Sequence, residues 1–168
     1  MSPNRPLRVG VADLLSHPGT RRELHTSVVL DGLRTSAAEV PEGGEVSVDL
    51  VLEAIGGGTL TATGTVGAPW RGECRRCLEP VEGSAEVDVR EIFETRPTEG
   101  ETYPLGAEQV DLEPMVRDAV LLAMPLAPLC AETCVGPAPE SFPTGPAPGD
   151  ERRVDPRWAG LSELEFDE

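Results

Sequence analysis

Four cysteines are the residues of this chain best suited to chemistry, and they occur as two close pairs. Two residues separate Cys74 from Cys77, and three residues separate Cys130 from Cys134. Each pair can place two sulfurs on one metal ion from a single turn of backbone, and zinc takes four thiolates in a tetrahedron without redox chemistry. The spacing therefore predicts one structural zinc site built from all four cysteines.

Two other uses of these thiols stay open at the level of sequence. The cysteines could be unligated, or a pair could form a disulfide or the Cys-x-x-Cys centre of a thiol-disulfide oxidoreductase. Such enzymes place the pair at the N-terminus of a helix, whereas Leu78, Glu79 and Pro80 lead from Cys77 into an alternating, strand-like pattern. The sequence thus favours metal binding over redox catalysis.

The remaining residues provide no set suited to catalysis. His17 and His25 lie in polar segments without a nucleophile nearby, so we expect both to face solvent. The glycine run at residues 56–58 lacks the lysine, the hydroxyl and the following helix of a phosphate-binding loop, and it is better explained as a tight turn. The sequence therefore indicates a protein without enzymatic activity.

The chain is strongly acidic, which limits the partners it can bind. Its net charge is −16, from 30 acidic residues against 14 basic ones, and every basic residue is arginine. Such a surface repels nucleic-acid phosphates and attracts basic proteins, for example ribosomal proteins, although acidity that serves only solubility is an alternative. The exception lies beside the first cysteine pair, where Arg71, Arg75 and Arg76 form a basic patch that is a candidate contact for RNA or a partner.

Length and composition place the chain in a broad class of proteins. A chain of 168 residues is sufficient for one domain with its own core. The N-terminus opens no apolar run with a small-residue cleavage site, and no stretch approaches the roughly 18 apolar residues that a membrane span needs. We therefore expect a cytoplasmic protein whose thiols stay reduced, which favours a metal over a disulfide.

Alternating apolar residues predict a sheet built from neighbouring strands. Residues 46–53 and 59–66 alternate between apolar and polar side chains, which is typical of a β-hairpin closed here by the glycine run. Residues 81–90 continue the pattern as a third antiparallel strand, so the first cysteine pair falls on the turn before it. Shorter patterns at residues 7–11 and 28–30 indicate two further strands.

One helix is expected after these strands. Apolar residues recur at spacings of three and four over residues 112–123, Asp111 can cap the N-terminus, and Pro125 ends the helix. The chain then passes directly into the second cysteine pair. We therefore expect an α+β domain over residues 1–134, an antiparallel meander or partly closed sheet packed by one main helix, with a metal-pinned core over residues 46–134.

The composition changes beyond the second cysteine pair. Residues 135–154 are rich in proline and glycine and carry few large apolar groups, which is typical of a linker that cannot fold alone. Residues 155–168 are expected to form a short amphipathic segment on this flexible tether, which either docks a partner or folds back on its own domain. The apolar residues of this segment, which are candidate partner contacts, are Trp158, Leu161 and Leu164.

Three sequence blocks form a distinctive series along the chain. They are Glu73-Cys74-Arg75-Arg76-Cys77-Leu78-Glu79-Pro80-Val81, the segment from Val110-Asp111-Leu112 through Val116-Arg117-Asp118 to Leu122-Ala123-Met124-Pro125-Leu126-Ala127-Pro128-Leu129-Cys130, and Asp155-Pro156-Arg157-Trp158-Ala159-Gly160-Leu161. In their order and spacing they resemble the YceD-like family, bacterial and plastid proteins described as large ribosomal RNA subunit accumulation proteins. The first two blocks together are the more specific part of the resemblance.

The chain departs from this family after Cys134. Relatives often carry a Gly-Leu-Cys-Pro-x-Cys-Gly segment there, whereas this chain has Gly136-Pro137-Ala138-Pro139 and no later cysteine. A second half-site at those family positions would leave this chain without a metal. The four-cysteine site therefore rests on the local count of thiols rather than on the resemblance.

The resemblance implies a role in the accumulation of 23S ribosomal RNA, and hence in large-subunit biogenesis, with no established catalytic activity. Because the surface is acidic, we expect action through a ribosomal protein or an assembly factor, with the 23S rRNA precursor as a second candidate partner. Two other functions stay open: a thiol-disulfide oxidoreductase using Cys74 and Cys77, and a protein-binding module unrelated to the ribosome.

Overall fold

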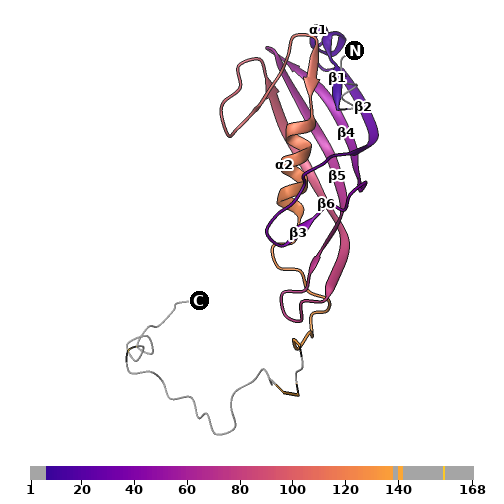
Figure 1. Cartoon of the computed structure of the whole chain (residues 1–168). Helices are drawn as coiled ribbons and strands as arrows, with labels where there is room; N and C mark the ends of the chain where they lie inside the picture. The colour runs from indigo at the N-terminus through magenta and orange to yellow at the C-terminus, as the bar shows by residue number, and fades with distance from the viewer. Residues whose placement is uncertain (1–6, 138–139, 142–156, 158–168) are drawn as a thin grey trace. The chain divides into compact units, whose positions relative to one another are not determined.

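A computed structural model describes residues 7–137, 140–141 and 157 of the chain. Its main feature is a six-stranded sheet in the order β2-β4-β5-β6-β7, with β3 also paired to β5, and a smaller sheet joins β1 to β8 (Figure 1). In chain order the elements are β1 (Arg8–Gly10), α1 (Ala12–Ser16), β2 (Arg21–Val29), β3 (Ala38–Glu39), β4 (Glu45–Gly56), β5 (Thr59–Glu73), β6 (Pro80–Glu94), β7 (Tyr103–Pro104), β8 (Gln109–Asp111) and α2 (Glu113–Ala123).

The centre of the sheet is an antiparallel meander, as the sequence predicts. β4 and β5 form the expected hairpin, and all three glycines of its turn have positive φ angles, which residues with side chains rarely adopt. β5 then pairs with β6 along its whole length, from Thr59 opposite Glu94 to Glu73 opposite Pro80. Because β4 pairs with β5 only as far as Gly67, the β5–β6 hairpin continues beyond it and carries the first cysteine pair at its turn.

The two faces of the sheet differ in polarity, which fixes where the core lies. Along β4 the even-numbered residues from Val46 to Ala54 are buried, while most odd-numbered ones are exposed or half-buried. Helix α2 packs over the buried face of β5 and β6 through its own apolar stripe. The buried residues of α2 are Met115, Val116, Ala119 and Val120. The largest fully buried side chains elsewhere include Phe93, Leu7, Leu50, Leu52 and Leu60.

The small sheet fixes the start of α2 beside the N-terminal strand. Arg8 Nε lies 3.0 Å from Asp111 Oδ2, and the Leu112 amide donates to the Leu7 carbonyl at 2.9 Å. The helix begins at Glu113 with Leu112 at the N-cap position, so the cap expected at Asp111 is wrong by one residue. Asp111 belongs to β8, yet its Oδ1 still accepts the Glu113 amide at 3.1 Å and satisfies one donor of the first turn.

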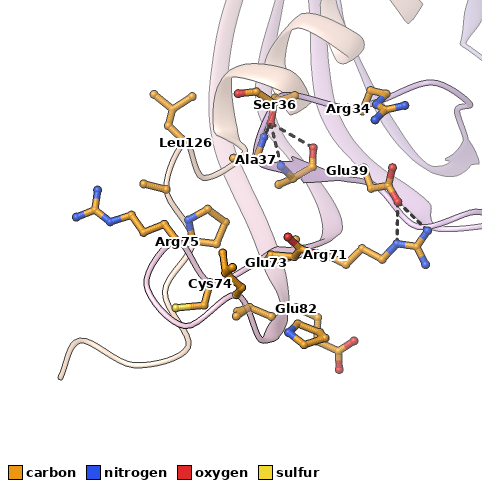
Figure 2. Close-up of a pocket in the computed structure, with 18 residues that line it drawn as sticks. Arg34, Ser36, Ala37, Glu39, Arg71, Glu73, Cys74, Arg75, Glu82 and Leu126 are labelled. Carbon is orange, nitrogen blue, oxygen red and sulfur yellow. Dashed lines mark hydrogen bonds and ion pairs between the residues drawn. The ribbon is translucent and has the colours of Figure 1, made fainter. Parts of the chain in front are cut away.

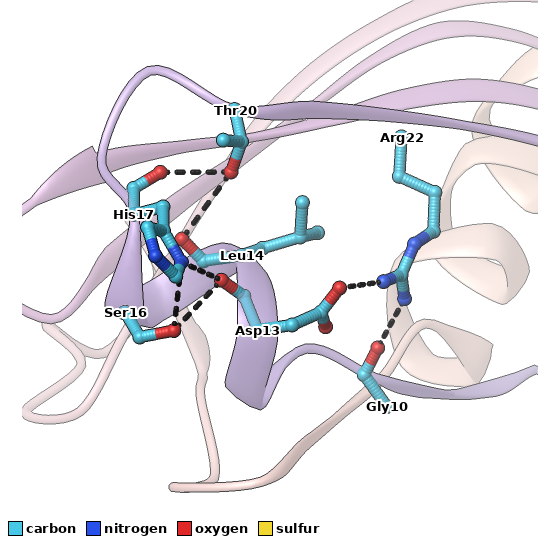
Figure 3. A network of polar contacts seen from close by, with 7 residues as sticks. All are labelled: Gly10, Asp13, Leu14, Ser16, His17, Thr20 and Arg22. Atoms are coloured by element: carbon cyan, nitrogen blue, oxygen red, sulfur yellow. Dashed lines mark hydrogen bonds and ion pairs between the residues drawn. The ribbon is translucent and has the colours of Figure 1, made fainter.

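The N-terminal segment contains more regular structure than its sequence suggests. Helix α1 was not expected, and Figure 3 shows how Arg22 ties it to the sheet by donating to the Asp13 carboxylate and to the Gly10 carbonyl. This guanidinium holds the pKa of Asp13 below its usual range. The start of the strand expected at residues 28–30 was predicted wrongly, because β2 already begins at Arg21.

Both histidines face solvent, as expected. His17 Nδ1 lies 3.1 Å from Ser16 Oγ and 3.2 Å from the Asp13 carbonyl, within the local network of α1. His25 Nδ1 lies 2.7 Å from Asp49 Oδ1 on the open face of the sheet, and this carboxylate raises the pKa of His25.

Two features of the expected architecture are corrected by the structure. The sheet is open rather than partly closed, because β2 and β7 at its two ends do not pair with each other in the described part of the chain. It is also mixed, since β7 runs parallel to β6. The α+β class is consistent with this arrangement. The linker predicted at residues 135–154 and the amphipathic segment at 155–168 lie almost entirely outside the described residues and stay predictions.

No helix in the described part of the chain is long enough and apolar enough to cross a bilayer.

Gly64 provides a direct test of the strand register. Its φ is 152°, and a Cβ built there would lie 2.0 Å from the Asp49 carbonyl oxygen of β4. We expect Gly64→Ala to lower the free energy of unfolding by about 3 kcal/mol, because a rigid backbone neighbour must move. Urea denaturation measures the change, with Thr63→Ala, an exposed residue of the same strand, as a control that costs less than about 1 kcal/mol. Equal losses in the two variants would contradict this register.

Candidate metal centre

The first cysteine pair lies in a tight turn that closes the β5–β6 hairpin. The Cys74 amide donates to the Glu79 carbonyl and the Leu78 amide donates to the Cys74 carbonyl, each at 2.8 Å. Leu78 has a φ of 63°, an uncommon value for a residue with a side chain, and 66% of it is exposed. The turn thus adopts a locally unfavourable backbone without burying Leu78, so burial of that side chain does not account for its geometry.

The second cysteine pair reaches this turn from the end of α2. Met124 leaves the helix in an extended conformation before Pro125, and the chain then runs past Pro128, whose carbonyl accepts the Arg75 amide at 3.0 Å. Arg76 Nη1 donates to the carbonyls of Cys134 at 2.7 Å and Glu132 at 3.2 Å. Main chain and side chain of the hairpin turn therefore both bind the segment that carries the second pair.

The four sulfurs converge on one point. Their ligand atoms all lie within 4.8 Å of one another, and the nearest approaches are 3.8 Å between Cys74 and Cys134 and 3.6 Å between Cys77 and Cys130. A tetrahedral zinc–thiolate site with bonds of about 2.3 Å has sulfur–sulfur edges of roughly 3.8 Å. All four thiols are free, and these separations far exceed the roughly 2.0 Å of a disulfide bond. The arrangement fits four ligands around a single metal ion.

The thiols of this cluster differ in acidity. Backbone amides of Cys77, Cys130 and Arg76 stabilise the Cys74 thiolate and lower its pKa to about 6. The Glu79 amide acts to lower the pKa of Cys77, but desolvation and the neighbouring Cys74 outweigh it, and the net change is upward. The protonated Cys130 thiol is stabilised by hydrogen bonds that it donates to the sulfurs of Cys134, Cys77 and Cys74, which raises the pKa of Cys130 to about 12. One thiolate thus forms readily and opposes ionisation of its neighbours unless a cation is added.

A groove of about 930 Å³ borders this centre (Figure 2). Its walls come from residues 34–39 around β3, from β5 and the cysteine turn, from the start of β6, and from residues 126–128 after α2. Leu126, 82% exposed, and Leu78 give it an apolar rim. The charged residues that line it are Arg34, Arg71 and Arg75, balanced by Glu39, Glu73 and Glu82.

Comparison with known proteins assigns a family to the region that contains this cysteine centre. A family model described as "Large ribosomal RNA subunit accumulation protein YceD" matches residues 62–165, which include all four cysteines. The chain belongs to the YceD family. The resemblance inferred from three sequence blocks is thereby confirmed, and the family description associates YceD with ribosomal RNA of the large subunit.

Several mycobacterial proteins are similar to this YceD-family chain over most of its length. Uncharacterized proteins of Mycobacterium bovis and Mycobacterium tuberculosis are each 37% identical over 171 residues, covering 95% of this chain and 81% of the relative. An uncharacterized protein of Mycobacterium leprae is 33% identical over 141 residues, covering 73% of this chain and 60% of the relative. No solved structure matches the chain.

The structure describes some of the other residues singled out from the sequence, whereas others lie outside the described residues. Arg71 forms an ion pair with Glu39 at 2.7 Å (Figure 2). Arg76 donates hydrogen bonds to backbone carbonyls around the second cysteine pair. Arg75 is exposed beside the groove. Their roles in contacting RNA or a partner stay predictions. The apolar contacts expected from the amphipathic segment, Trp158, Leu161 and Leu164, lie outside the described residues.

Two contributors to the centre were not found from the sequence of this YceD-family member. Arg76 was assigned only to a basic patch, since no spacing pattern marks an arginine that binds carbonyls 56 and 58 residues away. The groove was also missed, because its walls come from four separate segments of the chain. Leu78 offered a weak signal, as a large apolar residue inside a polar turn is unusual.

The unequal acidity of the thiols predicts a two-stage titration of the metal-free protein. We expect one thiol to ionise near pH 6, and those with raised pKa values only in the alkaline range. Thiolate absorbance in the ultraviolet measures both stages. Cys74→Ser should remove the acidic stage, whereas Cys130→Ser should leave it, because backbone amides lower the pKa of Cys74. Titration of all the thiols in one alkaline step would contradict this assignment.

Proposed function

We propose that this protein is a non-enzymatic factor that supports accumulation of 23S ribosomal RNA and assembly of the large ribosomal subunit. In this proposal Cys74, Cys77, Cys130 and Cys134 hold one structural zinc ion. The main support is that the four cysteines converge at the meeting point of the two most specific family blocks, within a chain that belongs to the YceD family.

Zinc is the metal that this donor set favours. Four thiolates are soft ligands, and zinc accepts them in a tetrahedron without a redox change. A site with four protein ligands has no open position for a substrate, which supports a structural rather than a catalytic ion. The ion would replace the thiol protons whose hydrogen bonds to neighbouring sulfurs raise the pKa of Cys130, and it would join the β5–β6 turn to the segment that follows α2.

The charge distribution supports a protein partner over direct RNA binding. The chain has a net charge of −16, and the arginines that line the groove beside the cysteines are balanced by glutamates. Phosphate binding depends on uncompensated cations, whereas a basic ribosomal protein or assembly factor is attracted to such a surface. We therefore propose that the protein acts on the 23S rRNA precursor through a basic protein.

A thiol-disulfide oxidoreductase is the competing function, and one observation favours it. The pKa of Cys74 is lowered to about 6, as in reactive thiols. However, Cys74 is fully buried, its pair lies in a hairpin turn rather than at a helix N-terminus, and the downstream sulfurs are close by instead of remote. These features fit metal ligation better than thiol exchange.

Metal analysis tests the zinc site directly. Protein purified without chelator should contain about one zinc per chain, and Cys74→Ser should lose it, because three sulfurs bind far more weakly than four. Arg75→Ala is the matched control, since Arg75 lies in the same turn but contributes no sulfur, and it should retain zinc. Chelation of the wild-type protein should lower its thermal stability, as structural zinc contributes on the order of 10 kcal/mol. Full-stoichiometry zinc in Cys74→Ser would refute this ligand set.

Depletion of the protein in its host cell tests the ribosomal role. We expect a lower ratio of 23S to 16S rRNA and an accumulation of large-subunit precursors on sucrose gradients. Wild-type protein should restore mature subunits, and Cys74→Ser should not if zinc supports the active fold. Unchanged rRNA ratios and gradients after depletion would argue for a protein-binding module unrelated to the ribosome, whatever the result of metal analysis.

A further inference from the structure

Strand β6 has an outer edge that no other strand covers over most of its length. On one side it pairs with β5 at every position from Pro80 to Glu94. On the other side only Phe93 and Glu94 pair, with the two residues of β7. Within the described part of the chain, no backbone hydrogen bond links residues 81–92 to any segment except β5. Helix α2 packs over the buried face of β5 and β6 and supplies no hydrogen bond to this edge.

This edge lacks most of the devices that usually block strand addition. Natural edge strands are kept short, interrupted by proline or bent by a bulge, because every second residue directs its N–H and C=O outward. The β5–β6 ladder runs through fifteen consecutive pairs without a register shift, and its proline is at the first position of β6. Residues 81–92 therefore present a continuous row of hydrogen-bonding groups.

The charge of the edge indicates which partner it accepts. Glu82, Glu86 and Asp88 are exposed along β6, and Arg90 is the basic residue among them. At the opposite end of the sheet, β2 carries a mixture of both signs in Arg21, Arg22, Glu23 and His25. Carboxylates repel a second copy of β6 and repel nucleic acid, while they attract cationic side chains. The acidic edge thus discourages self-association and favours a basic strand.

We propose that the β6 edge binds an extended lysine- and arginine-rich segment of a partner protein as an added strand. Main-chain hydrogen bonds to residues 81–92 supply the affinity, and the carboxylates of Glu82, Glu86 and Asp88 select a cationic sequence. This inference deepens the proposed function, because it identifies the surface and the chemistry by which a basic protein is recognised. Its test uses purified components, so its outcome is independent of the depletion experiment.

The test uses a synthetic peptide of alternating lysine and valine with the full-length, metal-loaded protein. We expect binding by calorimetry, together with slowed amide hydrogen exchange at alternate residues of 81–92 and unchanged exchange in β2. The same peptide N-methylated at alternate residues keeps its charge but cannot form a ladder, and it should bind at least about tenfold more weakly. Equal affinity of the two peptides would overturn the proposal, because binding would then be electrostatic alone.

Charge variants of the protein test the selection of a basic sequence. Glu86→Gln with Asp88→Asn should weaken the lysine–valine peptide roughly fivefold and reduce the salt dependence of binding. Glu42→Gln with Glu108→Gln removes two exposed carboxylates elsewhere and should leave the affinity unchanged. Equal losses in the two double variants would overturn the assigned edge. Protection of β2 instead of β6, or a dimer that protects β6 without peptide, would also overturn it.

Discussion

The convergence of four cysteine sulfurs is the constraint on which the β5–β6 turn and the segment after α2 depend. Cys74 and Cys77 come from a hairpin turn, whereas Cys130 and Cys134 come from a segment that follows the only long helix of the described residues. Leu78 and Leu126 contribute little apolar burial in this region, since both are largely exposed. The hydrogen bonds of Arg75 and Arg76 hold the two segments together, and they place the thiols where a cation can join them.

The sheet and the cysteine centre serve different purposes. The core between α2 and the buried face of the sheet is continuous and apolar, and it needs no metal to exclude water. The hairpin beyond β4 adds few residues to this core, Ala68 and the half-buried Trp70 among them, so backbone pairing and the thiol cluster contribute more to its order. An acidic domain of this kind keeps a stable body while it offers two distinct surfaces, the open strand edge and the groove beside the cysteines.

Local sequence patterns predicted the parts of the fold that depend on neighbours in the chain. The alternation through Val46, Val48 and Leu50, the glycine turn and the apolar stripe of α2 each act over a few residues, and all three elements are present. The pairs β1–β8 and β6–β7 were missed, because two- and three-residue strands carry too little pattern and depend on distant partners. Strand β2 was partly missed since its charged residues interrupt the apolar signal.

The candidate site was likewise predicted only in the part that depends on local sequence. Cysteine spacing predicted which side chains would come together, because ligands of one ion must share a half-site geometry. The support from Arg76, the strained Leu78 and the walls of the groove follow only from the folded chain, because they join segments far apart in sequence. The amphipathic segment predicted at residues 155–168 lies outside the described residues except at Arg157, so its role rests on the sequence alone.

The order of the two cysteine pairs along the chain has a consequence for biosynthesis. A ribosome completes β4, β5 and β6 before it makes α2, so the nascent hairpin displays two sulfurs while their counterparts are still untranslated. Bringing distant residues together carries a loop-closure cost that only the later, longer chain can offset through packing of α2. The complete thiol cluster can therefore form only after Cys134 has been synthesised, and a polypeptide terminated before that residue lacks it.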